Sequence, residues 1–453
     1  MTPRRLNPAI MCRRTKLASL TFVFLLLAPA LGVEAQGWME DRSRREGPGL
    51  RVGDFELHPG VGVELGWDSN VFYSDQTPLD SGLIRTTAHL DFSTLSGERL
   101  AGEGEGAESQ TPPSVDFRGG VAAAFYGYFV NRVQSNLEAD ANLQLTIMPE
   151  RPFSLTFTEN FGRAIRPFTE PSAVGNNYAR VDNDAGVRLN FATVGGVLSG
   201  NLGYNFLLRY FEGDSFKYAS YFTHRIGAGA AFRFLPQTAL IYDFRLDMVD
   251  YFENTTVFSG SLLSDSAMLR TRIGLNGAIS NNVSAMILVG YAGGFYSEAA
   301  LSEYDMVVGQ AELRWKISET SQLALGYEGD YHNSFVGGFR RRDRGYINGQ
   351  LMMGGSFLLG AEASAGLVDF GPQLSASGAP LGAGGVSARS DIIAKASLFA
   401  EYRLTDWLGL NGTVAYTGDF TDFVYTVPTG MTVRPDPAGY QKVELWAGVR
   451  VFY

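Results

Sequence analysis

The chain has 453 residues, of which 45% are apolar, 13% aromatic and 19% charged, with 54 glycines, one cysteine and a formal net charge of −10. Nucleic-acid-binding proteins are normally basic, so the acidic balance excludes that class, and one cysteine excludes a disulfide framework. The charged fraction is below the ~25% of soluble proteins. Beyond residue 35 no run of ~20 apolar residues predicts a membrane helix, and the content of large apolar residues excludes a disordered chain.

Residues 1–35 have the three parts of a secretory signal peptide. The basic start contains Arg4, Arg5, Arg13, Arg14 and Lys16. The apolar run Leu17–Ala30 is too short for a membrane anchor and contains Pro29, and Val33-Glu34-Ala35 is a small-residue cleavage pattern. Cleavage after Ala35 would remove Cys12, five positive charges and one negative charge, which leaves a net charge of −14. We therefore expect an exported protein without disulfides.

The segment that follows predicts long amphipathic strands. Over residues 133–147, VQSNLEADANLQLTI, odd positions are almost all apolar and even positions polar or acidic. Side chains of a strand alternate between two faces, so one face is apolar and the other polar. The alternation returns over 240–248, 310–317 and 391–404, although Ile393 and Phe399 fall on the polar face. Such strands exceed the ~5–6 residues usual in soluble sheets and reach the ~9–11 of a tilted membrane strand.

Eighteen candidate strands follow one another along the chain. They are 58–68, 82–94, 114–127, 133–147, 152–166, 178–191, 196–210, 218–235, 237–251, 265–280, 282–297, 304–318, 320–335, 344–359, 361–371, 388–404, 408–420 and 440–453. Tight links are expected at 149–151, 195–196, 236, 281, 319, 360 and 405–407, and long ones at 69–81, 167–177, 252–264, 372–387 and 421–439. Short turns on one side and long loops on the other are typical of outer-membrane barrels. The acidic segment 95–113 is a long link on the short side, either a flexible insertion or a docking loop.

The C-terminal residues 442–453, KVELWAGVRVFY, alternate and end on an aromatic residue. This resembles the terminal strand signal of bacterial outer-membrane proteins. Backbone groups in lipid must pair within the protein, so the sheet must close. We predict an all-β protein in the bacterial outer membrane: a transmembrane antiparallel barrel of about 18 (16–18) strands, with short periplasmic turns and longer extracellular loops. The expected organisation is a signal peptide at 1–35, a periplasmic N-terminal segment at 36–54 and the barrel at 55–453.

No enzyme motif is recognised in the sequence. The four histidines, His58, His89, His224 and His332, lack metal-ligand spacing, and the chain has neither a P-loop nor a Gly-x-Ser-x-Gly elbow. We therefore expect no catalytic residue, no cofactor and no metal.

The polar strand faces are predicted to line the lumen. Their acidic residues are Glu138, Asp140, Asp182, Asp184, Asp243, Asp247, Glu312, Glu328, Asp330, Asp391, Glu401 and Glu444. Their basic residues are Arg188, Arg209, Arg225, Arg233, Arg245, Arg270, Arg272, Arg314, Lys316, Lys395, Arg403 and Arg450. Barrels of about 16–18 strands hold an aqueous channel, and mixed charge without a dominant sign suits a bulky hydrated solute. Alternatively, these charges pair across strands and only solvate the wall.

One basic cluster, Arg340, Arg341, Arg342 and Arg344, is expected in an extracellular loop. Such a loop either contacts lipopolysaccharide phosphates at the outer leaflet or guides an acidic polymer outward.

The segment Gly66-Trp67-Asp68-Ser69-Asn70-Val71 resembles the opening element of a family of outer-membrane β-barrel porins associated with exopolysaccharide export loci. The resemblance implies an exit channel for a polysaccharide made by a Wzx/Wzy-type pathway, and no catalytic residue. A separate periplasmic partner, contacting residues 36–54 or 95–113, would then deliver the polymer. The alternatives are a general or solute-specific diffusion porin, and an adhesin or structural barrel. The expected surroundings are outer-membrane lipids and lipopolysaccharide, without nucleic acid.

Overall fold

The computed structural model describes residues 49–94, 114–130, 133, 135–149, 152–165, 179–213, 217–252, 263–298, 301, 303–334, 337–375, 378–429 and 432–453. The predicted signal peptide, residues 36–48 of the N-terminal segment and the acidic link 95–113 lie outside them. No helix in these ranges has the length and apolarity needed to cross a bilayer.

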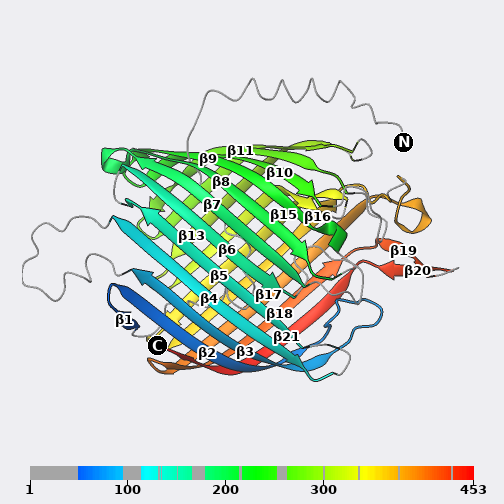
Figure 1. Cartoon of the computed structure of the whole chain (residues 1–453), viewed down its shortest axis with the longest axis horizontal. Helices are drawn as coiled ribbons and strands as arrows, with labels where there is room; N and C mark the ends of the chain where they lie inside the picture. Colours follow the sequence, from blue (N-terminus) through cyan, green and yellow to red (C-terminus); the bar gives the residue numbers. More distant parts are fainter. Residues whose placement is uncertain are drawn as a thin grey trace, which may run out of the picture.

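Eighteen long strands form a single closed sheet (Figure 1). They are β2 (Phe55–Asp68), β3 (Ser81–Thr94), β4 (Val115–Tyr128), β5 (Asn136–Ile147), β6 (Phe153–Ala164), β7 (Arg180–Ala192), β8 (Leu198–Phe211), β9 (Tyr221–Leu235), β10 (Thr238–Tyr251), β11 (Ser266–Ser280), β12 (Val283–Tyr296), β13 (Tyr304–Lys316), β14 (Gln322–Ser334), β15 (Gly338–Met353), β16 (Phe357–Phe370), β17 (Arg389–Thr405), β18 (Leu408–Phe420) and β21 (Tyr440–Phe452). Each strand pairs antiparallel with the next, and the last, β21, pairs with β2. The predicted fold class and strand count are confirmed.

The remaining elements are short and are not strands of the barrel wall. β1 (Leu50–Val52) forms a hairpin with the start of β2, and β19 (Val424–Thr429) pairs with β20 (Thr432–Pro437) within the connection from β18 to β21. Three single turns of 3-10 helix occupy connections: η1 (Val194–Gly196), η2 (Lys217–Ala219) and η3 (Ala383–Gly385).

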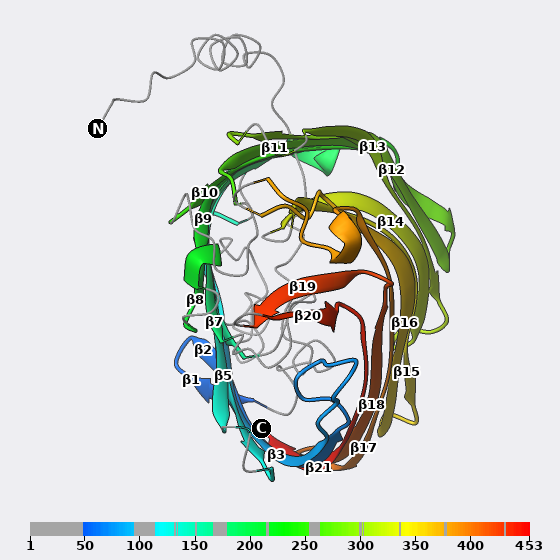
Figure 2. The same ribbon diagram turned by 90° about the vertical axis from the view of Figure 1, so that its right-hand side faces the viewer.

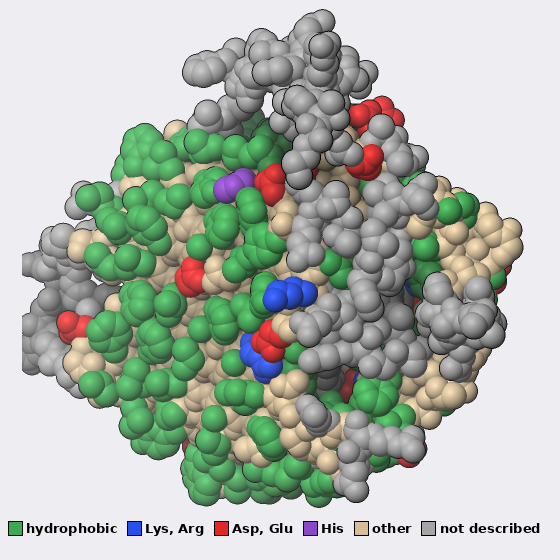
Figure 3. Space-filling view, turned by 45° about the vertical axis from the view of Figure 1, so that its right-hand side comes forward, with side chains coloured by type: hydrophobic (Ala, Val, Ile, Leu, Met, Phe, Trp, Pro, Cys, Tyr) green, Lys and Arg blue, Asp and Glu red, His purple; other side chains and the backbone are tan. Residues whose placement is uncertain are grey.

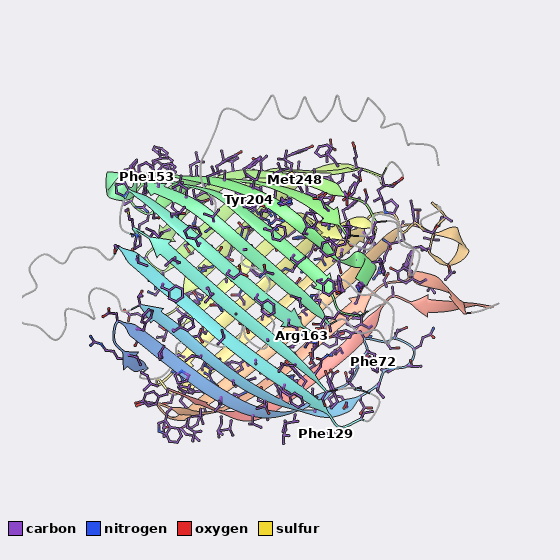
Figure 4. All side chains as sticks on the ribbon, viewed as in Figure 1. Phe72, Phe129, Phe153, Arg163, Tyr204 and Met248 are labelled. Carbon is purple, nitrogen blue, oxygen red and sulfur yellow. The ribbon has the colours of Figure 1, made fainter. Side chains whose placement is uncertain are left out.

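The outer face of the wall is apolar and the inner face polar. Large hydrophobic side chains are exposed at alternate positions of the strands, as on β2, where Val61, Val63 and Leu65 are 56%, 49% and 60% exposed. Figure 3 shows this face covered with hydrophobic side chains and only isolated charges. Aromatic residues stand at both ends of the wall, with Phe153 at one end and Phe129 at the other (Figure 4). This is the surface that a bilayer-spanning barrel requires.

The motif Gly66–Val71, at the end of β2, joins the first strand to the last. Gly66 leaves room for the Trp446 ring, because a Cβ at this position would lie 2.5 Å from that ring. Asp68 forms an ion pair with Lys442 at 2.7 Å. Asn70, which is 1% exposed, donates from its side chain to the carbonyls of Ser74 (2.7 Å) and Gln441 (2.9 Å). In this structure the motif therefore stabilises barrel closure.

Asn70→Ala is expected to lower the free energy of unfolding by about 2 kcal/mol, since it leaves buried carbonyls without donors. Urea unfolding of the micelle-bound barrel measures the loss. Asn142→Ala, at an exposed position on β5, is the matched control and should change stability little. Equal losses in both variants would show that Asn70 has no special role in closure.

The barrel end with the long connections, which we assign to the extracellular side, is partly covered by two of these connections. In Figure 2, β19 lies across the opening of the barrel, and Figure 1 shows β19 and β20 beyond the end of the wall. The connection that carries β19 and the one that carries η3 dock together: Gly382 bridges Tyr425, and the N–H of Thr426 donates to the carbonyl of Leu381 at 3.1 Å. The Arg389 guanidinium on β17 donates to the Tyr425 hydroxyl at 2.8 Å and so holds the docked connections to the wall.

An apolar cluster, here called the mouth cluster, lies across the lumen at the same end. It joins residues of β8, η2 and β10 with residues of β16, which lies six strands from β10 in the sheet. Its buried members are Phe211, Tyr218, Ala219, Val249, Tyr251, Leu263, Val368 and Phe370. Ile393, which breaks the polar face of β17 in the sequence, packs against it. These contacts connect β10 with β16 at the extracellular end of the lumen.

One stretch of the strand assignment was wrong. The tight turn expected at Gly360 lies instead at residues 354–356, where Gly354 and Gly355 adopt positive φ angles of 59° and 70°. Glycine adopts this conformation without steric cost, whereas Gly360 lies inside β16. The predicted strands 344–359 and 361–371 therefore correspond to β15 and β16, and β15 begins six residues earlier than expected.

Candidate solute pathway

The inward face of the wall carries most of the ionisable side chains, and their signs are separated between two halves of the barrel. From β7 to β15, inward positions hold thirteen basic side chains: Arg180, Arg188, Arg209, Arg225, Arg233, Arg245, Arg270, Arg272, Arg314, Lys316, Arg340, Arg342 and Arg344. They hold seven carboxylates: Asp182, Asp184, Asp243, Asp247, Glu312, Glu328 and Asp330. We call this half the basic wall.

The opposite half, formed by β16–β18, β21 and β2–β6, is the acidic wall. Its inward positions hold seven cations: Arg85, Arg118, Arg389, Lys395, Arg403, Lys442 and Arg450. They hold twelve carboxylates: Glu56, Glu64, Asp68, Asp91, Asp116, Glu138, Asp140, Glu362, Asp391, Glu401, Asp419 and Glu444. Opposed walls of unlike sign produce a field across the lumen that acts on any charged solute.

Four carboxylates of the basic wall, Asp182, Asp243, Asp247 and Glu328, are each shared between two arginines. Asp247 pairs with Arg225 at 2.8 Å and with Arg245 at 2.6 Å. Asp243 likewise accepts from Arg270 and Arg272 on the neighbouring strand. One carboxylate for two guanidinium groups leaves net positive charge along β9–β11.

The same pattern continues on β14 and β15. Glu328 pairs with Arg342 at 3.2 Å and Arg344 at 3.3 Å. Arg270 on β11 reaches past two strands to Asp330 on β14 at 2.5 Å, which joins the two groups. Guanidinium groups in such an array offer forked donors that match carboxylate and phosphate oxygens.

Seven of the twelve carboxylates of the acidic wall are buried. Glu401 is fully buried and accepts from Arg450 at 2.8 Å and from Arg403 at 3.4 Å. Glu64, 1% exposed, accepts from Arg85 at 2.5 Å and from the Asn411 amide at 2.5 Å. These contacts cross strands on both sides of the β2–β21 junction and stabilise it.

All 24 predicted lumen residues occupy inward positions of their strands. Their contribution to solute passage stays a prediction. The alternative, that such charges pair across strands, describes many of them, since Asp182, Asp247 and Glu401 each contact two arginines. The sequence analysis missed inward charges on β2, β3 and β21, including Glu64, Arg85 and Lys442. The alternation of apolar and polar residues along these strands is the signal that could have found them.

The basic cluster was assigned to the wrong place. Arg340, Arg341, Arg342 and Arg344 lie in β15, not in a loop, because the turn that ends this strand falls at 354–356. Arg340, Arg342 and Arg344 face the lumen. Arg341 lies on the outer face and pairs with Asp343 at 2.5 Å. A role as an extracellular loop is therefore excluded by their position in the wall.

A second departure from the expected pattern is a carboxylate on the outer face. Glu159 is the seventh of the 12 residues of β6 and alternates with Phe157 and Phe161, which are 42% and 38% exposed. The Asn183 amide of β7 donates to it. This pair lies near the middle of the apolar belt, where lipid-facing charge destabilises a barrel.

Replacing Glu159 and Asn183 together with leucine is expected to raise the free energy of unfolding by about 1 kcal/mol, since both polar groups leave the lipid face. Urea unfolding in lipid vesicles measures the gain. Glu159→Gln, which retains a polar group there, should stabilise less. A loss of stability in the leucine variant would mean that this face contacts something other than lipid.

Within the described ranges, no group of three or more His, Cys, Asp or Glu side chains could hold a metal ion.

No protein-family model and no curated protein matches the chain. Similar solved structures include the outer membrane protein opdK from Pseudomonas aeruginosa, with a TM-score of 0.43 and 10% identity over 88% of this chain and 99% of that one. OpdQ from the same organism has a TM-score of 0.45 and 9% identity over 88% and 97%. An FrpB iron transporter from Neisseria meningitidis has a TM-score of 0.46 and 10% identity over 89% and 82%. The closed sheet and apolar outer face of this chain define it as a transmembrane β-barrel of the outer-membrane type.

Proposed function

We propose that the chain is an outer-membrane diffusion porin that passes small anionic solutes along its basic wall. The observation that carries the proposal is the separation of charge between the two halves of the lumen. An anion in such a lumen is drawn toward the basic wall, where thirteen cations face seven carboxylates. A wall of one sign raises the local concentration of the opposite ion beside it. Seven of the twelve carboxylates of the acidic wall are buried, against four of the thirteen cations of the basic wall, so the basic wall presents more of its charge to a solute.

The contacts at the extracellular end favour a small solute. The mouth cluster and the docked connections at Gly382 and Tyr425 reduce the open cross-section. A polysaccharide strand needs a continuous wide passage, so these contacts give no support to polymer export, the function that the resemblance implies. Export would still predict loss of surface polysaccharide in a deletion strain with monomer synthesis intact.

Uptake of labelled sugars of nearly equal size into proteoliposomes tests the proposal. Gluconate, glucose and glucosamine carry negative, zero and positive charge, and valinomycin with potassium removes the membrane potential. We expect gluconate to enter fastest and glucosamine slowest, and maltoheptaose to be excluded. Equal rates for the three sugars would refute charge selection, and entry of maltoheptaose as fast as glucose would favour a polymer channel.

A further inference from the structure

We call the line along which two neighbouring strands of the wall pair a seam. The seam between β13 and β14 is shorter than the others. Their register runs from Gly309 with Gly329 to Lys316 with Gln322, which is eight residue pairs. The other seventeen seams of the wall have nine or more pairs. Beyond Gly309 and Gly329 the two strands continue toward the extracellular end, but β13 pairs only with β12 and β14 only with β15.

In this extracellular half the two edges overlap. Tyr304, Met306 and Val308 are on the inward face of β13, whereas Tyr331 of β14 and Phe339 of β15 are on the outward face of their strands. These residues nevertheless form one buried cluster. The inner surface of β12–β13 therefore packs on the outer surface of β14–β15, and Figure 2 shows β14 lying inside the arc of β12 and β13.

The overlap is lined by aromatic rings. Tyr304 and Tyr331 stack with centroids 4.3 Å apart and planes 13° apart, and Phe339 lies 4.8 Å from Tyr304. The Tyr296 hydroxyl donates to the carbonyl of Gly338 at 3.2 Å. Ring stacking and side-chain hydrogen bonds, among them one from the Tyr331 hydroxyl to the Met306 sulfur, replace the continuous backbone ladder found at other seams. Opening this joint separates aromatic rings and breaks no backbone hydrogen bonds between the two strands. It therefore costs less free energy than opening a seam of paired strands.

Charged groups stand on both sides of the joint. On the lumen side, Asp330 is adjacent in sequence to Tyr331 and holds Arg270 at 2.5 Å. On the outer side, the Arg341 guanidinium lies 3.7 Å from the Met306 sulfur and pairs with Asp343. A passage lined by rings and flanked by arginines matches a molecule with an apolar tail and an anionic headgroup.

We propose that the β13–β14 joint is a lateral portal that binds an anionic amphiphile between the lumen and the outer leaflet. The tail would lie between the two overlapping sheets, against Tyr304, Tyr331 and Phe339. The headgroup would meet Arg341 at the outer rim. Lateral binding is independent of axial diffusion of small anions, because the two use different surfaces of β14.

Photolabelling tests the portal directly. The probe is a twelve-carbon carboxylate with a terminal diazirine, added to the protein in lipid vesicles, and labelled peptides are mapped by mass spectrometry. We expect labels on the overlapped residues Tyr304, Met306, Tyr331 or Phe339, and several-fold fewer with the matching alcohol. Labels confined to lipid-facing residues such as Val307 and Leu325, or equal labelling by the alcohol, would overturn the proposal.

A disulfide across the joint provides a second test of the portal. Within the variant Tyr304→Cys with Tyr331→Cys, labelling of Phe339 should be several-fold lower in the oxidised form than in the reduced form. Leu325→Cys with Ile347→Cys, across the registered β14–β15 seam, is the control and should leave labelling unchanged. Labelling of Phe339 that persists after the first disulfide forms would refute the portal. Gluconate uptake, measured on the same vesicles, should be unaffected by either disulfide and separates this test from that of the porin function.

Discussion

Replacing Arg340, Arg342 and Arg344 together with glutamine is expected to lower the preference of the barrel for gluconate over glucosamine by about tenfold. The three side chains face the lumen from one strand, and their loss leaves Glu328 without its two arginines. This stretch of the basic wall then becomes acidic and repels an anion. Paired uptake rates of the two sugars in proteoliposomes measure the change.

Arg341→Gln is the control because it removes an arginine from the same strand but from the opposite face. Arg341 lies on the outer face and pairs with Asp343, so the sugar preference should stay within about twofold of the parent protein. An equal effect of the single and triple variants would indicate that the overall charge of β15, not its lumen face, determines selection.

Glu401→Gln is expected to lower the free energy of unfolding by about 3–5 kcal/mol, the usual cost of removing one partner from a buried ion pair. Glu401 is fully buried and is the carboxylate that Arg450 and Arg403 share. Because it links β17 with β21, the loss weakens the wall near its closure. The midpoint of urea unfolding in micelles reports the change.

Glu362→Gln is the control for that substitution. Glu362 faces the lumen from β16 at an exposed position, where a neutral amide should change stability by less than about 0.5 kcal/mol. If Glu362→Gln destabilises as much as Glu401→Gln, the buried network around Glu401 contributes nothing beyond general lumen charge.

Alternation along the strands predicted the barrel and the inward side of each charged residue, because a two-residue period assigns faces without knowledge of tertiary contacts. It also placed Phe399 on the polar face of β17, where the structure buries it at 4% exposure. The location of the β15–β16 turn was not predictable in this way. Gly354-Gly355 is a glycine pair like Gly195-Gly196, at which a tight link was expected, and positive φ angles mark both pairs as turns. The single Gly360 lies inside β16.

The sequence analysis also did not predict that the lumen charges group by sign into two walls. In the printed order, acids and bases alternate without a dominant sign, and this suggested a lumen suited to a bulky solute. Sheet closure brings β21 beside β2 and so collects Glu64, Glu401 and Glu444 into one half. The overlap of β13 and β14 is likewise a property of packing, since both strands keep their alternation while their ladder ends at Gly309.

Ion selectivity in planar bilayers tests the central account most directly, because it reports both a conducting lumen and the sign of its field. With potassium chloride more concentrated on one side, an anion-selective channel gives a reversal potential of the sign set by chloride. We expect that sign, and we expect it to weaken when Arg340, Arg342 and Arg344 are replaced with glutamine. A barrel that inserts without conducting, or a reversal potential of the sign set by potassium, would contradict the proposed anion porin.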